Sequence, residues 1–410
     1  MTSTINISAN TQHYLELEEQ YGAHNYHPLP VVLNRGEGVF LYDVDGKRYY
    51  DFLSGYSAVN QGHCHPKIIG SLFEQAQKLT LTSRAFHNDL LGQYEKYITA
   101  YFGYDKVLPM NTGVEAVETA IKLCRKWGYE VKWIEADKAK IIVCNNNFHG
   151  RTVNVISFST DPTAKKNFGP FMEGYECVAH NDLVALEKAL QDSNVAAFIF
   201  EPIQGEAGVV VPDEGYYKGI RELCTEYNVL MVADEIQTGL ARTGKMLACD
   251  HENVRPDILI LGKALSGGVL PVSAVLCDDE IMMTIKPGEH GSTYGGNPLA
   301  CAVAMTALQV LKDEQMAENA EAMGELLRSE LRKLNSPFIA MVRGKGLLNA
   351  IVIKHSNPDA GWELCLALKE NGLLAKPTHG DKIRFAPPLV IKKEQILESV
   401  GIIAKSLGCL

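Results

Sequence analysis

Short apolar runs alternate with helical stretches through the middle of this chain, and this alternation limits the possible fold more than any other feature. An amphipathic helix is predicted at 114–127. Strands are predicted at 106–110, 140–144, 196–200, 229–233, 258–261 and 272–277. Strands that are separated by helices form parallel sheets whose faces the helices cover. The sequence therefore predicts an α/β fold with a mostly parallel central sheet.

Polar side chains stand at the ends of five of these runs. They are Asn111, Asn145, Glu201, Asp234 and Lys263. The carboxyl ends of parallel strands meet at one edge of a sheet, and ligands bind at that edge. One polar strand end is ordinary, but five that converge predict a binding site.

The most informative of these residues is Lys263, which follows an apolar run directly, while Asp234 ends another such run. A charge at the end of a buried strand is costly unless the site uses it. Burial lowers the pKa of a lysine, and its amine then becomes a nucleophile or a Schiff-base former. A nearby carboxylate would keep the ring nitrogen of pyridoxal 5′-phosphate (PLP) protonated. Lys263 and Asp234 together therefore predict PLP chemistry.

Composition excludes several other classes of function. The net charge is −10 and is spread along the chain, whereas nucleic acid and anionic membranes require a basic surface. Apolar residues form 46% of the 410 residues, which is enough for a sizeable core. The ten cysteines are scattered singly, without a C-x-x-C pair, which predicts reduced thiols rather than disulfides or a zinc site.

The first residues carry no targeting signal of a familiar kind. Residues 1–20 lack a basic region with an apolar core, contain no arginine and include Glu16, Glu18 and Glu19. This differs from secretory signals and from mitochondrial transit peptides. No apolar stretch reaches the length of about 18 residues that crosses a membrane. We expect a soluble cytoplasmic protein, and a mature form from which a transit peptide has been removed is the alternative.

Two domains are expected from the change of pattern along the chain. Residues 55–298 would form a large PLP-binding α/β domain, and 1–54 together with 299–410 would form a small α+β domain. Residues 36–51 are predicted to be a hairpin with its turn at Asp45 and Gly46, which packs with the C-terminal unit. The C-terminal unit is predicted to contain one or two long helices at 299–334, strands at 346–353 and 382–385, and helices at 360–371 and 393–406.

Several further residues suit the same cofactor, although each has a simpler explanation. Gly113 and Val114 would place free N–H groups at the start of a helix, where a phosphate is favoured. An ordinary N-cap by Thr112 is the alternative. Phe148 could stack on the pyridine ring or pack in the core, and Gln237 could donate to the phenolic oxygen of the ring.

Two other segments are less specific. The glycine-rich loop at 290–298 carries the hydroxyl groups of Ser292 and Thr293, which suit phosphate binding, and it could also be a domain hinge. The segment 63–65 (His-Cys-His) resembles a metal cluster but fits better as a loop before Pro66. No metal is expected.

Taken together, these segments resemble the class III PLP-dependent aminotransferases, which have fold type I. The resemblance covers nearly the whole chain, and within the family it is strongest to members that act on ornithine. The stretches that carry it are 21–30, 112–116, 148–151, 201–208, 234–244, 291–298 and 376–380, together with Lys263. The first and last of these stretches are more specific than the cofactor motifs.

The resemblance implies a role for each matching residue. Lys263 would hold PLP covalently and then move the proton between the carbons of substrate and cofactor, while Asp234 would hold the pyridine nitrogen. The other cofactor contacts would come from Gln237 at the ring oxygen, Phe148 on the ring face, Gly113 and Val114 at the phosphate, and Ser292 and Thr293 at the phosphate of the neighbouring subunit. The last pair implies that a homodimer is the minimal active unit.

The substrate residues that the resemblance implies are two arginines, two tyrosines and a glutamate. Tyr26 and Arg151 would bind the ornithine carboxylate that is remote from the reacting amine, and Tyr56 would shape the pocket. Arg384 would bind the α-carboxylate of glutamate or 2-oxoglutarate, and Glu206 would pair with it while ornithine reacts. An unpaired Arg384 would attract the wrong end of ornithine. Without the resemblance, a surface arginine would explain Arg151 and Arg384 equally well.

The expected activity is transfer of the δ-amino group of L-ornithine to 2-oxoglutarate. The products would be L-glutamate and glutamate 5-semialdehyde, which cyclises to pyrroline-5-carboxylate. Another ω-amino donor, 4-aminobutyrate or N-acetylornithine, is the nearest alternative, and a catalytically silent binding protein with the same fold is the alternative of a different class. Many members of the family carry histidine at position 149, where some ornithine enzymes carry tryptophan, so we expect His149 to alter the pocket shape modestly.

Overall fold

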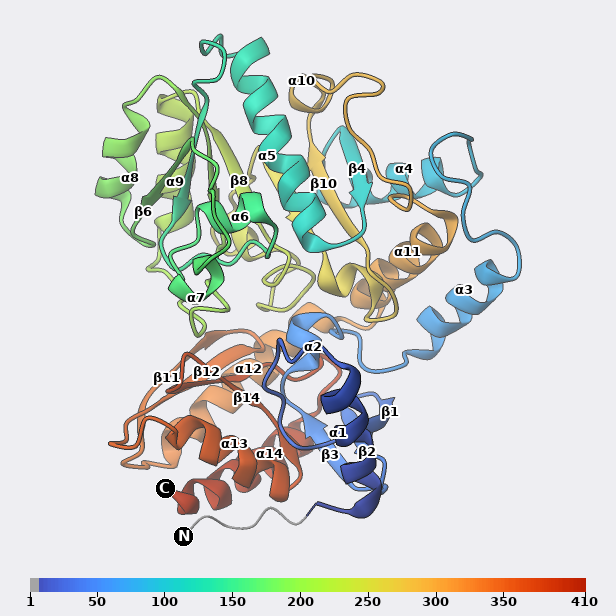
Figure 1. The fold of residues 1–410 in the computed structure, drawn as a ribbon, viewed down its shortest axis with the longest axis vertical. Coiled ribbons are helices and arrows are strands. Elements are labelled where there is room, and N and C mark those ends of the chain that lie inside the picture. Colours follow the sequence, from blue (N-terminus) through green and yellow to red (C-terminus); the bar gives the residue numbers. More distant parts are fainter. Residues whose placement is uncertain (1–6) are drawn as a thin grey trace.

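The computed structural model describes residues 7–410, and residues 1–6 of the predicted small domain lie outside them. A seven-stranded sheet occupies the upper half of the molecule in Figure 1. Its strands, in spatial order, are β4 (Lys106–Met110), β10 (Ser273–Cys277), β9 (Ile258–Leu261), β8 (Leu230–Asp234), β7 (Val195–Phe200), β5 (Lys140–Cys144) and β6 (Tyr175–Val178). All neighbours are parallel except that β10 is antiparallel to β4 and β9. The predicted mostly parallel α/β sheet is confirmed.

Helices cover both faces of this sheet, which explains why its strands read as continuous apolar runs. All six residues of β7 are buried. Ala197 and Ile199 pack into the core beneath α5 (Gly113–Glu130). Phe198 and Phe200 point to the opposite face, which α8 (Leu183–Leu190) and α9 (Tyr216–Glu226) cover. The strand ends thus meet at one edge, between two covered faces.

Two smaller sheets lie in the lower half of Figure 1, and the first of them combines strands from both ends of the chain. The first has the order β1 (Leu33–Glu37), β2 (Phe40–Asp43), β3 (Arg48–Asp51) and β13 (Leu373–Leu374). The second has the order β11 (Ile339–Lys345), β12 (Leu348–Ile353), β15 (Lys382–Phe385) and β14 (Lys376–Thr378). The predicted hairpin and its packing on the C-terminal part are confirmed by the antiparallel β2–β3 pair and the parallel β3–β13 pair. The division into two domains at 54/55 and 298/299 stays an interpretation.

The remaining helices complete the layers. The predicted helical stretch at 299–334 is two helices, and Gln315 between them has a φ of 49°. The α-helices not yet given are α1 (Ala9–Tyr21), α2 (Ser54–Ser57), α3 (Pro66–Ala76), α4 (Leu91–Phe102), α6 (Val153–Ser157), α7 (Pro162–Lys165), α10 (Asp279–Met282), α11 (Pro298–Asp313), α12 (Met316–Lys333), α13 (Ala360–Glu370) and α14 (Lys393–Ser406). The 3₁₀ turns are η1 (Ala248–Glu252), η2 (Lys263–Ser266) and η3 (Leu407–Cys409).

Several classes of feature are absent from the part of the chain that the structure describes. No helix among residues 7–410 has both the length and the apolar character that crossing a bilayer requires. Within the same residues, no group of His, Cys, Asp and Glu side chains could hold a metal ion. The two histidines of the 63–65 segment contact carboxylates instead: His63 lies 2.7 Å from Asp51, and His65 lies 3.1 Å from Glu314.

Candidate active site

The ends of β8 and β9 place Asp234 and Lys263 in one cavity of about 190 Å³. Asp234 is the last residue of β8, whereas Lys263 follows β9 after Gly262 and begins η2. Glu201, at the end of β7, lines the same cavity. Of the five polar strand ends, three therefore converge. Asn111 and Asn145 do not line this cavity.

The backbone and the surroundings of Lys263 are both unusual. Its φ is +45°, a left-handed conformation that non-glycine residues seldom adopt and that often marks functional sites. Burial lowers the pKa of the Lys263 amine, and the charges of Glu206 and Asp234 oppose this shift without cancelling it. A larger fraction of the amine is therefore neutral, and nucleophilic, than for an exposed lysine.

Asp234 is held by hydrogen bonds to both of its oxygens. The Nδ1 atom of His149 lies 2.6 Å from Oδ2, and the N–H group of Ile236 donates to Oδ1 at 3.1 Å. Burial disfavours the charged form of His149, but the hydrogen bond and the charge of Asp234 outweigh it, and the pKa of His149 is raised. His149 thus contacts the predicted nitrogen-binding carboxylate rather than only altering the pocket shape. The sequence offered one indication of this contact, because His149 belongs to the segment 148–151 that was already singled out as part of the cofactor site.

Glu201 was not among the predicted cofactor or substrate residues, yet it supports the site. One of its carboxyl oxygens accepts a hydrogen bond from the N–H group of Phe148 at 2.8 Å. Burial raises the pKa of Glu201 to about 8, so the carboxyl is largely protonated at neutral pH. It can therefore anchor the loop of Phe148 without adding a second full negative charge beside Asp234.

The start of α5 combines an N-cap with a free pair of donors. Thr112 and Glu115 form a capping box, in which the Thr112 N–H group donates to Glu115 at 2.7 Å and the Glu115 N–H group donates to Thr112 at 3.4 Å. The N–H groups of Gly113 and Val114 cannot find partners within the helix and line the cavity instead. The N-cap explanation is therefore confirmed, while phosphate binding by the two donors at the positive end of the helix dipole stays a prediction that the cap does not oppose.

Gly150 keeps the loop of Phe148 close to these donors. Its φ is +127°, and a Cβ atom at this position would lie 2.3 Å from the Cγ2 atom of Val114. Only glycine therefore allows the chain after His149 to pass directly over the first turn of α5. Phe148 and His149 both line the cavity as a result.

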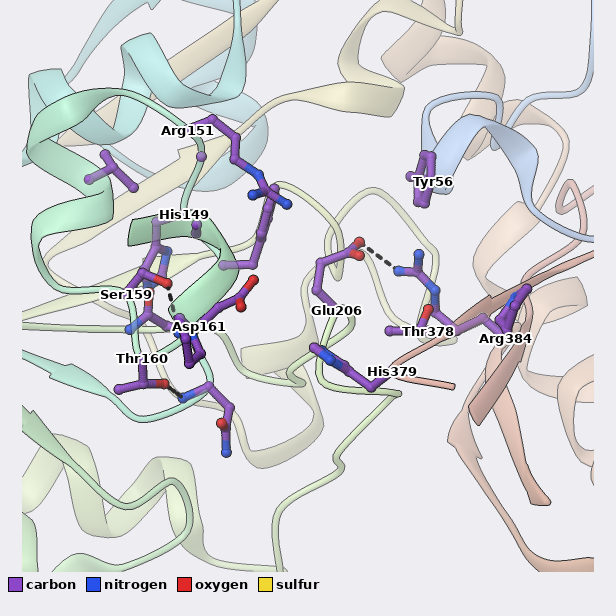
Figure 2. A pocket seen from close by; sticks show the side chains of 18 residues that line it. Tyr56, His149, Arg151, Ser159, Thr160, Asp161, Glu206, Thr378, His379 and Arg384 are labelled. Carbon is purple, nitrogen blue, oxygen red and sulfur yellow. Dashed lines mark hydrogen bonds and ion pairs between the residues drawn. The ribbon is translucent and has the colours of Figure 1, made fainter. Parts of the chain in front are cut away.

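A larger cavity of about 370 Å³ adjoins the first and is lined by four of the five predicted substrate residues, Tyr56, Arg151, Glu206 and Arg384 (Figure 2). Arg384, on β15, donates through Nη1 to Oε1 of Glu206 at 2.6 Å. The guanidinium of Arg384 lies 4.9 Å from the centre of the Tyr56 ring, and that of Arg151 lies 5.3 Å from the centre of the Phe148 ring. Burial raises the pKa of Glu206, but Arg384 outweighs this effect and the pKa is lowered. Glu206 and Arg384 therefore form a charged, mutually neutralising pair.

Gln237 lines the smaller cavity and contacts Glu206, which lines both cavities. Its Nε2 atom donates to Glu206 at 3.2 Å, while its buried Oε1 atom has no partner among the described residues. A Cβ atom on Gly205 would come within 1.4 Å of that Oε1, so the absence of a side chain at 205 makes room for Gln237. Its expected contact with a ring oxygen stays a prediction.

Three predicted residues lie outside both cavities of this chain. Tyr26 has 74% of its surface exposed and lines a separate surface depression. Ser292 accepts a hydrogen bond from the side chain of Asn111 at 2.8 Å, and Thr293 is exposed. The roles expected for these three residues stay predictions.

The residues present fit PLP. The smaller cavity offers the amine of Lys263, a carboxylate held for contact with a ring nitrogen, an aromatic side chain and a pair of free N–H groups for a phosphate. A lysine and an aspartate at neighbouring strand ends of a mostly parallel sheet, both facing one cavity, define a PLP-dependent transferase of fold type I.

Within that class, the chain belongs to the class-III aminotransferases, whose family model matches residues 21–407. It is 65% identical to the rat protein named "Ornithine aminotransferase, mitochondrial" over 398 residues, which is 97% of this chain and 91% of the rat protein. A solved ornithine aminotransferase from Toxoplasma gondii is 52% identical, has a TM-score of 0.95 and aligns over 97% of this chain and 94% of its own. A solved acetylornithine aminotransferase from Elizabethkingia anophelis is 60% identical, with a TM-score of 0.90 over 98% and 99% of the two chains.

Proposed function

We propose that this aminotransferase moves the δ-amino group of L-ornithine to 2-oxoglutarate. The observation that carries the proposal is the pair of Glu206 and Arg384, whose side chains lie 2.6 Å apart and face Arg151 across the larger cavity. The rat and Toxoplasma relatives are named ornithine aminotransferases, which supports ornithine as the donor.

The charge distribution of the cavity selects the orientation of ornithine. Because Glu206 neutralises Arg384, the α-carboxylate of ornithine finds its free guanidinium at Arg151. Arginine binds carboxylates strongly enough to fix the orientation of a small molecule. The other end of the molecule, with its δ-amine, then extends toward Lys263.

The second substrate requires the opposite arrangement. Both 2-oxoglutarate and glutamate carry two carboxylates and react at the α-carbon, so one carboxylate must lie close to the reacting atoms. Arg384 can take that carboxylate once Glu206 withdraws. The side chain of Glu206 is 25% exposed whereas that of Arg384 is 4% exposed, so Glu206 is the member of the pair with room to move.

The chain's own residues divide the chemistry between them. When bound, PLP supplies a carbonyl that exchanges with amines and a ring that accepts electrons. We assign Lys263 the covalent attachment of PLP and then the transfer of a proton at the substrate carbon. Asp234, supported by His149, keeps the ring nitrogen protonated, and the N–H groups of Gly113 and Val114 hold the phosphate.

Measured rates on three donors test the proposal directly. Ornithine, N-acetylornithine and 4-aminobutyrate should be compared with 2-oxoglutarate as the acceptor, and we expect the highest kcat/KM for ornithine. N-Acetylornithine is the competing donor, because the Elizabethkingia relative is named for it. A clear preference for either of the other two donors would reject the proposal.

The alternative of a silent binding protein is tested by absorption. With Lys263 and Asp234 both lining the cavity, we expect the purified protein to carry PLP covalently and to absorb visible light. Borohydride should remove that band, and Lys263→Ala should not form it. A colourless protein that takes up no PLP would favour the silent alternative.

We also propose that the active unit is a homodimer. The hydroxyl-bearing loop of Ser292 and Thr293 lies outside this chain's own cavity, as expected if it serves the neighbouring subunit. Sedimentation should then give a dimer, and Thr293→Ala should weaken PLP binding. A fully active monomer would contradict this.

A cytoplasmic location is likewise a proposal. It differs from the rat relative, which is named as mitochondrial. Cell fractionation with compartment markers decides between the two, and recovery with the mitochondrial matrix would reject the cytoplasmic location.

A further inference from the structure

The larger cavity contains a second pair of opposite charges, Arg151 and Asp161, and the proposed reaction assigns a role only to Arg151. Arg151 and Asp161 both line the cavity, and Figure 2 shows them on the same side of it, across from Glu206 and Arg384. Glu206 and Arg384 pair with each other, whereas between residues 7 and 410 neither Arg151 nor Asp161 forms an ion pair. A cation and an anion therefore face the same space with their charges uncompensated.

The carboxylate of Asp161 is held in place by its own segment. Its Oδ1 atom accepts a hydrogen bond from the Thr163 N–H group at 2.9 Å and caps the short helix α7. Its backbone N–H group donates to Oγ of Ser159 at 3.2 Å. No donor to Oδ2 is found among the described residues, so this oxygen is free to accept. A carboxylate that is already ordered loses little entropy when a ligand binds.

We infer that Asp161 binds the α-ammonium group of ornithine while Arg151 binds its α-carboxylate. This inference rests on the proposed function. The head of an α-amino acid is a zwitterion whose two charges share one carbon atom, and the two free side chains on one side of the cavity match them in sign. Asp161 would thereby distinguish α,ω-diamino acids from ω-amino acids that lack the α-nitrogen.

The size of the effect follows from the kind of contact. A hydrogen bond between two charged groups is stronger than one between neutral groups, but the partial exposure of Asp161 weakens its bond to the ammonium group. Loss of this bond should therefore lower the preference for ornithine over a donor without the α-ammonium group by about tenfold. The effect belongs to the donor and not to the acceptor, because 2-oxoglutarate has no ammonium group. The KM for 2-oxoglutarate should therefore stay within about twofold of its original value, because a partly exposed charge that does not contact the ligand changes its binding only weakly.

The test is Asp161→Asn in the PLP-loaded enzyme, with ornithine and 5-aminopentanoate as donors. The second donor is ornithine without its α-ammonium group. Asparagine caps helices as well as aspartate does, so the variant removes the charge but keeps the start of α7. Asp182→Asn is the matched control, because Asp182 caps α8 through the Ala185 N–H group at 2.9 Å and does not line the cavity.

We expect the ratio of kcat/KM for ornithine to that for 5-aminopentanoate to fall about tenfold in Asp161→Asn and to stay unchanged in Asp182→Asn. An equal loss for both donors would show a structural role and would overturn the inference, as would an unchanged ratio. If the parent enzyme prefers a donor other than ornithine, the proposed function fails and the inference fails with it. If the parent prefers ornithine and only the ratio in the variant is unchanged, the inference alone fails.

Discussion

Replacement of Glu206 by alanine should make the enzyme lose its preference for the δ-amine of ornithine. The side chain of Arg384 is 4% exposed, and its contacts are the carboxylate of Glu206 at 2.6 Å and the face of Tyr56 at 4.9 Å from the ring centre. In Glu206→Ala the guanidinium keeps only the aromatic contact. The α-carboxylate of ornithine can then replace the missing partner, which places the α-amine next to Lys263.

The magnitude follows from the geometry of the pair. Removing one partner of a buried ion pair costs about 3–5 kcal/mol, part of which the Tyr56 ring and entering water offset. If about 2 kcal/mol of this becomes available to a carboxylate ligand, the ratio of the two orientations changes about thirtyfold. Such a change turns a rare α-transfer into a readily measured one.

Product analysis measures this ratio. Ornithine consumed through its δ-amine yields pyrroline-5-carboxylate, whereas transfer of the α-amine yields a 2-oxo acid, and the two can be separated and counted. Glu325→Ala is a matched control, because Arg328 is also a buried arginine (6% exposed) paired with a carboxylate at 2.9 Å, but in α12 and outside both cavities. An unchanged product ratio in Glu206→Ala would refute the masking of Arg384.

Three further predictions concern the smaller cavity. Glu201 has a pKa of about 8 in the fold against an ordinary value of 4.5, so between these values the folded chain holds a proton that the unfolded chain releases. The free energy of unfolding should therefore fall as pH rises through this range, by up to about 1.4 kcal/mol per pH unit, and denaturant titrations should show that Glu201→Gln lacks this component. Gly205→Ala would place a Cβ atom 1.4 Å from Oε1 of Gln237 and should weaken PLP binding several-fold in absorbance titrations, whereas Gly401→Ala, with open space around its Cβ, should not. In the apoprotein, the rate of covalent PLP uptake should rise with pH around a midpoint below the ordinary pKa of lysine, because burial lowers the pKa of Lys263; a midpoint at the ordinary value would contradict this.

The central sheet was predictable because its strands are buried on both faces. Such strands read as uninterrupted apolar runs, and β5 and β9 begin and end where the sequence predicted. The edge strand β4 was also predicted with its observed bounds, because three of its five residues are buried. Strand β6 was not predicted. It lies at the edge of the sheet, and of its four residues only Val178 is buried, so the period of the side chains gives no signal there.

The position of Tyr56 depends on a backbone that propensity does not suggest. Residues 54–57 all have positive φ values, although only one of the four is a glycine. The turn is held by Asp51, which accepts from the N–H groups of Leu53 and Ser54 at 2.8 Å each, and by the hydroxyl of Ser54, which donates to the carbonyl of Ala386 at 2.7 Å. A contact between segments so far apart in sequence overrides the local preference for negative φ.

The contact between His149 and Asp234 was missed for a related reason. The two residues are 85 positions apart, and the sequence gives each a plausible local role. Their approach depends on the loop after β5 folding over the end of β8, and this path requires the positive φ of Gly150. The residue types were visible in the sequence, whereas the pairing arises from the fold.

The most direct measurement of the central claim follows nitrogen itself. Ornithine labelled with nitrogen-15 at the δ-position should be incubated with the PLP-loaded enzyme and 2-oxoglutarate, and the glutamate examined by mass spectrometry. We predict that the label appears in glutamate while the α-nitrogen stays in pyrroline-5-carboxylate. Glutamate without the label, formed instead from α-labelled ornithine, would contradict the account of Arg151, Glu206 and Arg384.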